Sequence, residues 1–205
     1  MKLSNFKINQ ENLLYKFSED SVKLLNMIKT LPPNAYVADL GAGSGIISIG
    51  ISKNFIVKTV HSFEIFKDSY ESLKSNICLN KCKSIIPLNQ NYKALKNKEF
   101  INYYNLIISN PPYIKKSELL SLDKDVKLYE PKIALSGGFS GLETFFKIIK
   151  KCNKLLKNNG MLFLEIGEKQ GKELRKNLKL NGFNQIKIYK DLSGKDRCLV
   201  STKNH

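Results

Sequence analysis

The sequence predicts an α/β protein built on a doubly wound, mostly parallel sheet, and three observations predict it. Short apolar runs typical of buried strands alternate with amphipathic stretches typical of helices as far as residue 182. The segment Asp39-Leu40-Gly41-Ala42-Gly43-Ser44-Gly45 supplies a glycine-rich turn between the first predicted strand and the next helix. Two strands then follow residue 182 with only a turn between them, so we expect a hairpin that adds an antiparallel strand at one edge.

The elements follow in chain order from periodicity and from residues that end helices. Residues 1–17 are polar with scattered apolar positions and should form an irregular arm. A helix should begin at Ser18-Glu19-Asp20, with Ser18 as N-cap, and stop at Pro32-Pro33-Asn34. The predicted strands are residues 35–40, 57–64, 85–88, 104–109, 160–166, 185–190 and 197–202. The predicted helices are residues 45–53, 67–80, 142–157 and 168–181, with a loop-rich stretch at 114–138.

Length and composition favour one globular unit. With 205 residues and 42% hydrophobic content, the chain can bury a substantial core. We expect residues 1–34 to form an N-terminal arm and helix and residues 35–205 to form the catalytic domain. No apolar run approaches the roughly 18–20 residues that cross a bilayer. The first seven residues lack the features of a secretory signal, so a cytoplasmic location with no membrane contact is the expectation.

Cysteine usage and charge bound the possible ligands. The four cysteines form no Cys-x-x-Cys pair and there are only two histidines, so we expect reduced thiols and no metal site. Lys+Arg minus Asp+Glu is 34 − 18 = +16, a charge that suits RNA, the ribosome or another polyanion. Lysine, asparagine and isoleucine are abundant throughout, however, so genome composition explains the charge nearly as well.

The glycine-rich turn has the pattern of a nucleotide-binding turn. Its candidate ligand-binding residues are Asp39, Gly41, Ala42, Gly43, Ser44 and Gly45. Glycines let the backbone adopt positive φ and approach a ligand closely. Asp39, at the strand end, can orient the turn and meet an amino group of the ligand. Glycines at three alternate positions serve no ordinary tight turn, which favours the binding interpretation.

Two further strand ends supply candidate contacts to a nucleoside. Glu64 ends the second predicted strand, about twenty residues beyond the glycine turn, where a carboxylate can accept both ribose hydroxyls. An exposed strand-end carboxylate is the alternative. Asn91 and Tyr92 follow the third strand and could meet an adenine with an acceptor and an aromatic wall. A solvated loop is an equally good interpretation of that pair.

The tetrapeptide Asn110-Pro111-Pro112-Tyr113 carries the predicted chemistry, directly after the apolar run 105–109. A primary amide nitrogen is a poor nucleophile, but the Asn110 side-chain oxygen and the Pro111 carbonyl can each accept one of its N–H groups and orient it. Pro112 restricts Pro111 to extended geometry. Tyr113 can stack on a planar group and favour a cationic methyl donor. Together with the glycine turn, this indicates methyl transfer from S-adenosylmethionine to an amide or exocyclic amine nitrogen.

Beyond the tetrapeptide, three segments resemble the protein-(glutamine-N5) methyltransferases that modify peptide-chain release factors. They are Tyr129-Glu130-Pro131 with Ala134-Leu135, Gly137-Gly138 and Gly141-Leu142; Leu164-Glu165-Ile166-Gly167 with Gln170-Gly171; and Asp191-Leu192-Ser193-Gly194-Lys195-Asp196-Arg197. The resemblance covers about residues 35–202. It implies a seven-stranded class I S-adenosylmethionine-dependent methyltransferase fold. It also implies that residues 41–45 and Glu64 bind that cofactor, and that residues 110–113 hold the glutamine of a Gly-Gly-Gln loop.

Three features depart from the family pattern. The bacterial family usually carries a helical N-terminal domain, whereas only 34 residues precede the first predicted strand here. Asn91 stands where an aspartate is common. Residues 17–21 look more like tRNA adenine-N6 methyltransferases, or like archaeal and eukaryotic relatives that work with a small zinc-binding partner subunit.

Three hypotheses follow for the function. The first is a release-factor glutamine methyltransferase with a protein substrate. The second is a tRNA adenine-N6 methyltransferase that uses the same tetrapeptide on a flipped base and the positive charge on phosphates. The third is a non-catalytic RNA- or ribosome-binding module, against which the intact tetrapeptide and glycine turn argue.

Overall fold

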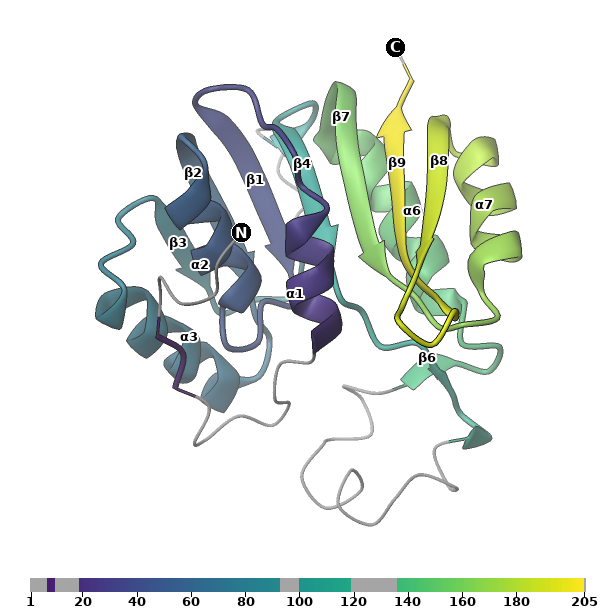
Figure 1. Cartoon of the computed structure of the whole chain (residues 1–205), viewed down its shortest axis with the longest axis horizontal. Helices are drawn as coiled ribbons and strands as arrows, with labels where there is room; N and C mark the ends of the chain where they lie inside the picture. Colours follow the sequence, from purple (N-terminus) through teal and green to yellow (C-terminus); the bar gives the residue numbers. More distant parts are fainter. Residues whose placement is uncertain (1–6, 10–18, 93–99, 119–135, 205) are drawn as a thin grey trace.

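A seven-stranded sheet with helices on both faces forms the protein (Figure 1). The computed structural model describes residues 7–9, 19–92, 100–118 and 136–204. The strand order is β3-β2-β1-β4-β7-β9-β8, and a separate two-stranded ladder joins β5 to β6. The strands are β1 (Ala35–Leu40), β2 (Val57–Phe63), β3 (Ile85–Leu88), β4 (Tyr104–Ser109), β5 (Ile114–Lys115), β6 (Ser136–Gly138), β7 (Leu156–Glu165), β8 (Phe183–Lys190) and β9 (Asp196–Lys203). The helices are α1 (Glu19–Asn26), α2 (Ile46–Asn54), α3 (Lys67–Leu79), α6 (Glu143–Leu155) and α7 (Gly171–Leu180).

The predicted doubly wound α/β class is confirmed. Strands β3, β2, β1, β4 and β7 pair in parallel. The predicted hairpin is present at one edge of the sheet, and its antiparallel strand is not the outermost one. β9 pairs antiparallel to both β7 and β8, so it lies one position in from the edge and β8 forms the edge. After α7 the chain enters the sheet as β8, one position away from β7 (Figure 1). It then turns back as β9, which occupies the position between β7 and β8.

Several boundaries differ from those expected, and the helix predicted to stop at Pro32 already ends at Asn26. The predicted helix to residue 157 ends at Leu155, and β7 begins at Leu156 rather than at 160. Asn159, with a φ of 61°, gives β7 an irregularity that periodicity does not show. The last helix begins at Gly171, three residues later than predicted. The proposed N-cap Ser18 lies outside the described residues, as do most of the arm and residues 119–135 of the loop-rich stretch.

The described piece of the arm is tied to α3 by two asparagines. Asn80 Oδ1 accepts from the Lys7 amide at 2.9 Å, and its Nδ2 donates to the Lys7 carbonyl. Asn76 pairs in the same two ways with Asn9 and also donates to the Ser44 carbonyl at 2.9 Å. The arm segment is therefore connected to the glycine turn through one buried amide.

Each face of the sheet buries its own apolar cluster. One cluster joins α6 and α7 to the sheet, and its largest fully buried side chains include Phe63, Tyr104 and Phe145. The other joins α1 and α2 to the opposite face through residues such as Leu25 and Ile49. Figure 1 shows α1, α2 and α3 in front of the sheet and α6 behind it. None of the helices in the described ranges is both long and apolar enough to cross a bilayer.

α1 packs on α2 where Leu25 lies over Gly50. Leu25 is fully buried, and a Cβ added at Gly50 would meet its side chain. The small residue therefore sets how closely the two helices approach.

We expect Leu25→Ala to lower the free energy of unfolding by about 2–5 kcal/mol, because it leaves a cavity at this contact. Leu180→Ala is the matched control. That leucine is 77% exposed on α7, and its loss should change stability by less than about 0.5 kcal/mol. Urea unfolding measures both variants. Equal effects would contradict the packing role assigned to Leu25.

Candidate functional site

The candidate site lies at one edge of the sheet, where the parallel strands end together. Pairing across the sheet places five residues in one row: Leu88 of β3, Phe63 of β2, Leu40 of β1, Ser109 of β4 and Leu164 of β7. The residues that follow this row are Asn89, Glu64, Gly41, Asn110 and Glu165. The register therefore brings the glycine turn between Glu64 and Asn110, as expected for a ligand site at the carboxyl ends of parallel strands.

The glycine turn uses its glycines for two different purposes. Gly41, Gly43 and Gly45 have φ values of 83°, 53° and 84°, in the left-handed region. A Cβ added at Gly41 or Gly43 would meet nothing within 4 Å, so open space lies over the first part of the turn. A Cβ at Gly45 would lie 2.5 Å from Leu73 Cδ1, so this glycine allows α2 to pack against α3. Ala42 and Ser44 are buried beneath the turn.

Glu64 holds the turn through its carboxylate. Its Oε2 accepts from the Gly43 amide and its Oε1 from the Phe66 amide, both at 2.9 Å. Burial raises the pKa of Glu64, and the two amide hydrogen bonds oppose that rise. Each carboxylate oxygen can accept a second hydrogen bond, so the predicted contact to ribose hydroxyls is compatible with this geometry. The alternative of an exposed carboxylate does not apply, because Glu64 is buried.

Asp39 lies buried below the turn. Its Oδ2 accepts from Ser48 Oγ at 2.6 Å, and Ser48 Oγ also shares a hydrogen bond with Ser62 Oγ at 2.7 Å. Its Oδ1 is buried and has no hydrogen-bond partner within the described part of the chain. Burial raises the pKa of Asp39 to about 7; the Ser48 hydrogen bond opposes the rise, and the nearby Glu64 charge adds to it. Asp39 thus links β1 to the first turn of α2, and one of its oxygens stays unsatisfied.

The expected adenine contacts lie three and four residues beyond Leu88, the member of the row on β3. Asn91 and Tyr92 are both partly buried, and Tyr92 packs against the apolar cluster under α6. Burial raises the pKa of the Tyr92 hydroxyl. Asn89, which the sequence did not single out, donates from Nδ2 to the Glu64 carbonyl at 2.9 Å. Ile65 is also new to the site and is exposed beside Glu64. The pairing register of β2 and β3 would have identified both residues as neighbours of the site.

The tetrapeptide begins directly after β4. Ser109 is buried, and its Oγ donates to the Leu40 carbonyl at 2.7 Å, which ties the end of β4 to the end of β1. Asn110 and Pro112 are partly buried and Pro111 is buried. The structure thus places residues 110–113 beside the glycine turn, as their sequence pattern requires.

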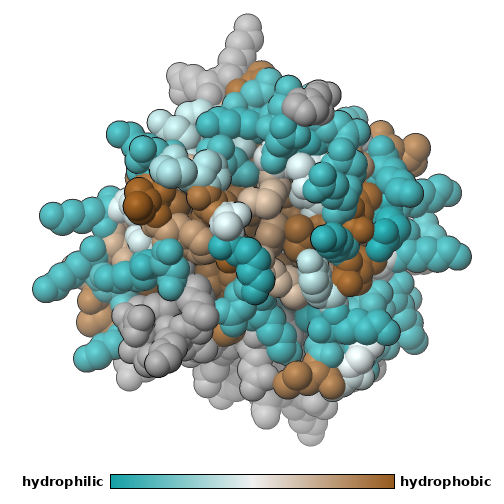
Figure 2. Space-filling view, turned by 45° about the horizontal axis from the view of Figure 1, so that its top comes forward, coloured by the Kyte–Doolittle hydropathy of each residue, from teal (hydrophilic) through white to brown (hydrophobic). Residues whose placement is uncertain are grey.

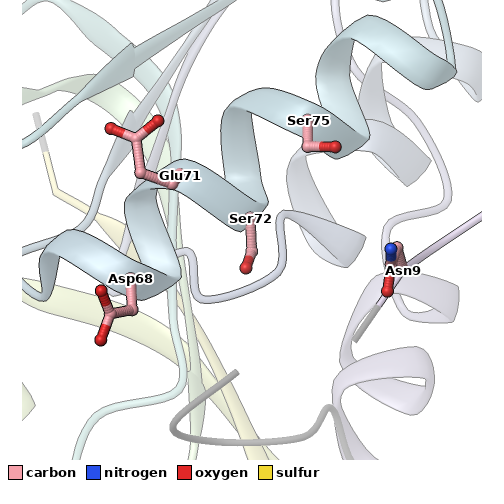
Figure 3. A pocket seen from close by; sticks show the side chains of 5 residues that line it. All are labelled: Asn9, Asp68, Glu71, Ser72 and Ser75. Carbon is pink, nitrogen blue, oxygen red and sulfur yellow. The ribbon is translucent and has the colours of Figure 1, made fainter. Parts of the chain in front are cut away.

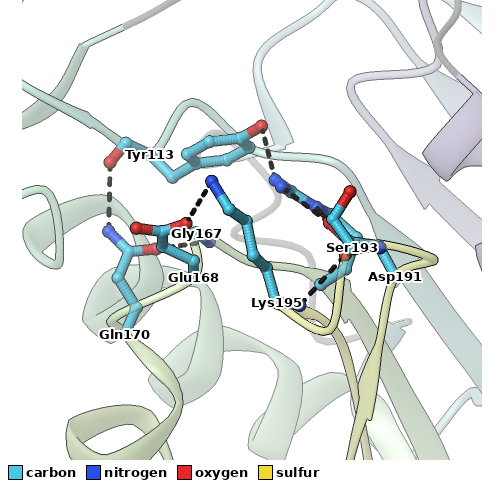
Figure 4. Close-up of polar contacts among 8 residues, drawn as sticks. Tyr113, Gly167, Glu168, Gln170, Asp191, Ser193 and Lys195 are labelled. Atoms are coloured by element: carbon cyan, nitrogen blue, oxygen red, sulfur yellow. Dashed lines mark hydrogen bonds and ion pairs between the residues drawn. The ribbon is translucent and has the colours of Figure 1, made fainter.

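Gln170 fixes the main chain of the tetrapeptide. Its Nε2 donates to the Tyr113 carbonyl oxygen at 3.0 Å and its Oε1 accepts from the Gly167 amide at 2.9 Å (Figure 4). Its Nε2 also donates to the Gly141 carbonyl oxygen at 3.0 Å. Glycines pack closely around the same point. A Cβ at Gly141 would lie 2.7 Å from the Tyr113 carbonyl oxygen. Segments that resemble the methyltransferase family but lie far apart in sequence therefore meet at Tyr113.

Arg197 holds the other end of Tyr113. Its Nη1 donates to the Tyr113 hydroxyl at 3.5 Å, and its Nη2 lies 3.2 Å from Asp191 Oδ2. The turn between β8 and β9 is thereby linked to the tyrosine ring (Figure 4). Residues 129–135 of the resembling segments lie outside the described residues.

A cavity of about 600 Å³ lies elsewhere, beside α3. The described residues that line it are Asn9, Asp68, Glu71, Ser72 and Ser75 (Figure 3). It contains none of the residues singled out from the sequence. Within the described ranges, no group of histidine, cysteine and carboxylate side chains is arranged to hold a metal ion.

The sheet topology and the position of the candidate site at the strand ends are those of a class I S-adenosylmethionine-dependent methyltransferase fold. Solved structures agree: a methyltransferase from Pyrococcus furiosus aligns with a TM-score of 0.73 at 16% identity, covering 99% of this chain and 91% of that one. A SAM-dependent O-methyltransferase from Thermotoga maritima aligns with a TM-score of 0.66 at 13% identity, covering 93% and 67%. Residues 16–124, more than half of the chain, match the family described as methyltransferase small domain. The chain belongs to that family.

Curated relatives show which methyltransferases the chain resembles in sequence. The release factor glutamine methyltransferase of Thermodesulfovibrio yellowstonii is 36% identical over 169 residues, which is 82% of this chain and 59% of the relative. That of Fusobacterium nucleatum is 35% identical over 185 residues, 90% of this chain and 51% of the relative. The resemblance predicted from the sequence is thus confirmed. The chain spans between about half and three fifths of the length of these relatives.

The raised pKa of Asp39 predicts a pH dependence of stability. Between about pH 4 and pH 7 the folded protein keeps a proton that the unfolded chain has lost, so stability falls as pH rises through this window. Asp39→Asn keeps a neutral partner for Ser48 and should reduce that fall by on the order of a few kcal/mol.

Urea unfolding at both ends of the window measures this effect in wild type and Asp39→Asn. Asp68→Asn, which changes an exposed aspartate on α3, is the matched control and should follow wild type. Identical pH dependence in wild type and Asp39→Asn would show that the buried carboxyl is already ionised in the folded state.

Proposed function

We propose that the chain is the catalytic part of an S-adenosylmethionine-dependent N-methyltransferase acting on the glutamine amide of the Gly-Gly-Gln loop of peptide-chain release factors. One observation carries this proposal. Leu40 pairs with Ser109, so the glycine turn and the Asn110 tetrapeptide leave the sheet side by side. A methyl donor and an acceptor nitrogen held by these two segments would be neighbours. The names of the curated relatives support the choice of substrate.

S-adenosylmethionine fits the residues at the strand ends. The open space over Gly41 and Gly43 leaves room for a ligand against the backbone. The buried, unpaired Oδ1 of Asp39 is an acceptor suited to a ligand amino group. The proposed cofactor-binding residues are Asp39, Gly41, Ala42, Gly43, Ser44, Gly45, Glu64, Asn91, Tyr92 and Asn110. When bound, the cofactor supplies an electrophilic methyl group on a sulfonium.

The tetrapeptide orients the acceptor nitrogen. The Asn110 side-chain oxygen and the Pro111 carbonyl each accept one N–H of the substrate amide, which aims the nitrogen lone pair and stabilises developing positive charge. Pro112 holds Pro111 extended, so the direction of its carbonyl is preset. Tyr113 stacks on the planar amide, and its backbone is held by Gln170. Catalysis then depends on orientation and electrostatics rather than on a side chain that removes a proton beforehand.

We also propose the division of the chain into residues 1–34, an arm and helix, and residues 35–205, the catalytic domain. Because release factors act in translation, the proposed substrate favours a cytoplasmic location. A small partner subunit that helps to grip the release factor is a further proposal. Co-purification of the tagged chain from its own cells is the measurement for it.

A second candidate, methylation of adenine N6 in tRNA, is favoured by the distribution of charge. Helices α6 and α7 expose a set of cations: Lys147, Lys150, Lys154, Lys172, Arg175, Lys176 and Lys179. Hydrophilic side chains also project widely over the face shown in Figure 2. We propose that the α6–α7 face is where RNA or the ribosome is contacted. Such contact is compatible with a release factor as substrate, because release factors work on the ribosome.

Labelled S-adenosylmethionine offered with purified release factor in one tube and total tRNA in another separates the two candidates. We expect label on the release factor, and mass spectrometry should find one added methyl group on the glutamine of its Gly-Gly-Gln loop. Label in tRNA as N6-methyladenine, with none on the release factor, would overturn the proposal.

Asn110→Ala should lower the rate of methyl transfer by ~10²–10³-fold, because a preorganised acceptor at the reacting nitrogen is lost. Affinity for S-adenosylhomocysteine, measured by calorimetry, should stay within about threefold of wild type, because the Asn110 side chain contacts the acceptor amide more than the cofactor. Asn184→Ala, at an exposed position on β8, is the matched control and should keep full activity. Turnover of Asn110→Ala close to wild type would remove Asn110 from its proposed role.

A further inference from the structure

Two loops that are linked to Tyr113 each present a highly exposed apolar side chain. Phe139, after β6, is 88% exposed, and Leu192, in the turn between β8 and β9, is 93% exposed. Apolar residues exposed singly are common and carry no meaning by themselves. These two differ in position, because the Phe139 loop packs against Tyr113 and the Leu192 turn is linked to the same residue through Arg197.

Close backbone contacts tie the Phe139 loop to the tetrapeptide. A Cβ at Gly137 would lie 2.8 Å from Tyr113 Cα, so the backbone at β6 runs directly against Tyr113. The Lys116 amide donates to the Gly138 carbonyl at 2.9 Å, just beyond Tyr113 in the chain. The side chain of Phe139 therefore extends from backbone that contacts the acceptor site.

The Leu192 loop is tied to the ring of the same tyrosine. Asp191 precedes Leu192 and holds Arg197, which donates to the Tyr113 hydroxyl. The segments that carry these two apolar side chains are thus linked to Tyr113 at its backbone and at its hydroxyl.

Both loops are held in shape by their own hydrogen bonds. Asp191 Oδ1 accepts from the amides of Ser193 and Lys195 at 2.9 and 3.0 Å. Glu143 Oε1 accepts from the Ser140 amide at 3.0 Å. An apolar side chain on an ordered turn loses little conformational freedom when a partner covers it, which favours binding.

The charges around these loops indicate the kind of partner. Three cations on segments adjoining Tyr113 each lie beside a carboxylate. Lys195 lies 2.8 Å from Glu168, Arg197 3.2 Å from Asp191, and Lys115 3.6 Å from Glu118. A surface built for phosphates presents uncompensated cations, whereas these three cations are paired and two exposed apolar side chains stand on adjoining loops.

We propose that Phe139 and Leu192 form a docking surface for a protein substrate. In the complex, these two side chains cover apolar side chains that flank the glutamine-bearing loop of that protein. This inference rests on the proposed function and specifies how the protein substrate is recognised. The surface lies beside Tyr113, so a protein that covers both side chains places its loop at the tetrapeptide. Phe139 and Leu192, at the rim of the site, then favour a protein substrate over a nucleic acid.

The test is steady-state kinetics of the double variant Phe139→Ser/Leu192→Ser with intact release factor. We expect KM for the release factor to rise at least about tenfold, since two side chains that become buried on binding are lost. The kcat at saturation and the affinity for S-adenosylhomocysteine should stay within about twofold of wild type. Ile56→Ser/Leu180→Ser, at residues 75% and 77% exposed on other elements, is the matched control and should keep the wild-type KM.

The outcomes separate this proposal from the proposed function. If wild type methylates the release factor and the double variant has an unchanged KM, the docking surface is wrong and the proposed function stands. An equal rise in KM for the control pair would also overturn the docking surface. If wild type leaves the release factor unlabelled, the proposed function falls, and the docking surface for that protein falls with it.

Discussion

The pairing of Leu40 with Phe63 on one side and Ser109 on the other determines where every proposed site residue lies. Parallel strands in register end together, so the residues that follow them must share one edge. Gly41, Glu64 and Asn110 become neighbours although they are spread over seventy positions of the sequence. A slip of one residue in β1 would turn its alternating side chains to the opposite faces and move Gly41 away from Asn110. The two apolar clusters, which fix that alternation, therefore also fix the site.

Two buried carboxylates act on the glycine turn in different ways. Glu64 uses both oxygens to hold amides of the turn and of the start of α3, so its electrostatic cost is partly offset by hydrogen bonds. Asp39 has one hydrogen-bonded oxygen and one buried oxygen without a partner in the described chain. The described part of the protein thus carries a buried acceptor without a partner two residues before the first glycine of the turn. Buried groups of this kind occur where a ligand completes the hydrogen bonding.

Much of this architecture could be predicted from the sequence, because its signals are local. Periodicity and helix-ending residues gave the order of strands and helices, and the glycine turn and tetrapeptide identified their own strand ends. The missing parts depend on contacts between distant residues. Nothing near Gln170 in the sequence shows that its amide joins Tyr113, Gly141 and Gly167. Asn89 and Ile65 became visible only through strand register, and Tyr92, taken for a loop residue, is partly buried and packs against an apolar cluster.

The place of β9 inside the sheet has a consequence for how the protein is made. β8 is synthesised before β9, yet β9 is the strand that it pairs with. Until β9 has left the ribosome, β7 presents an open edge and β8 has no neighbour in the sheet. Arg197, which reaches Tyr113, belongs to that same late strand. The sheet and the Arg197 contact to Tyr113 therefore both remain incomplete until β9 has been synthesised. A polypeptide that lacks β9 lacks both features.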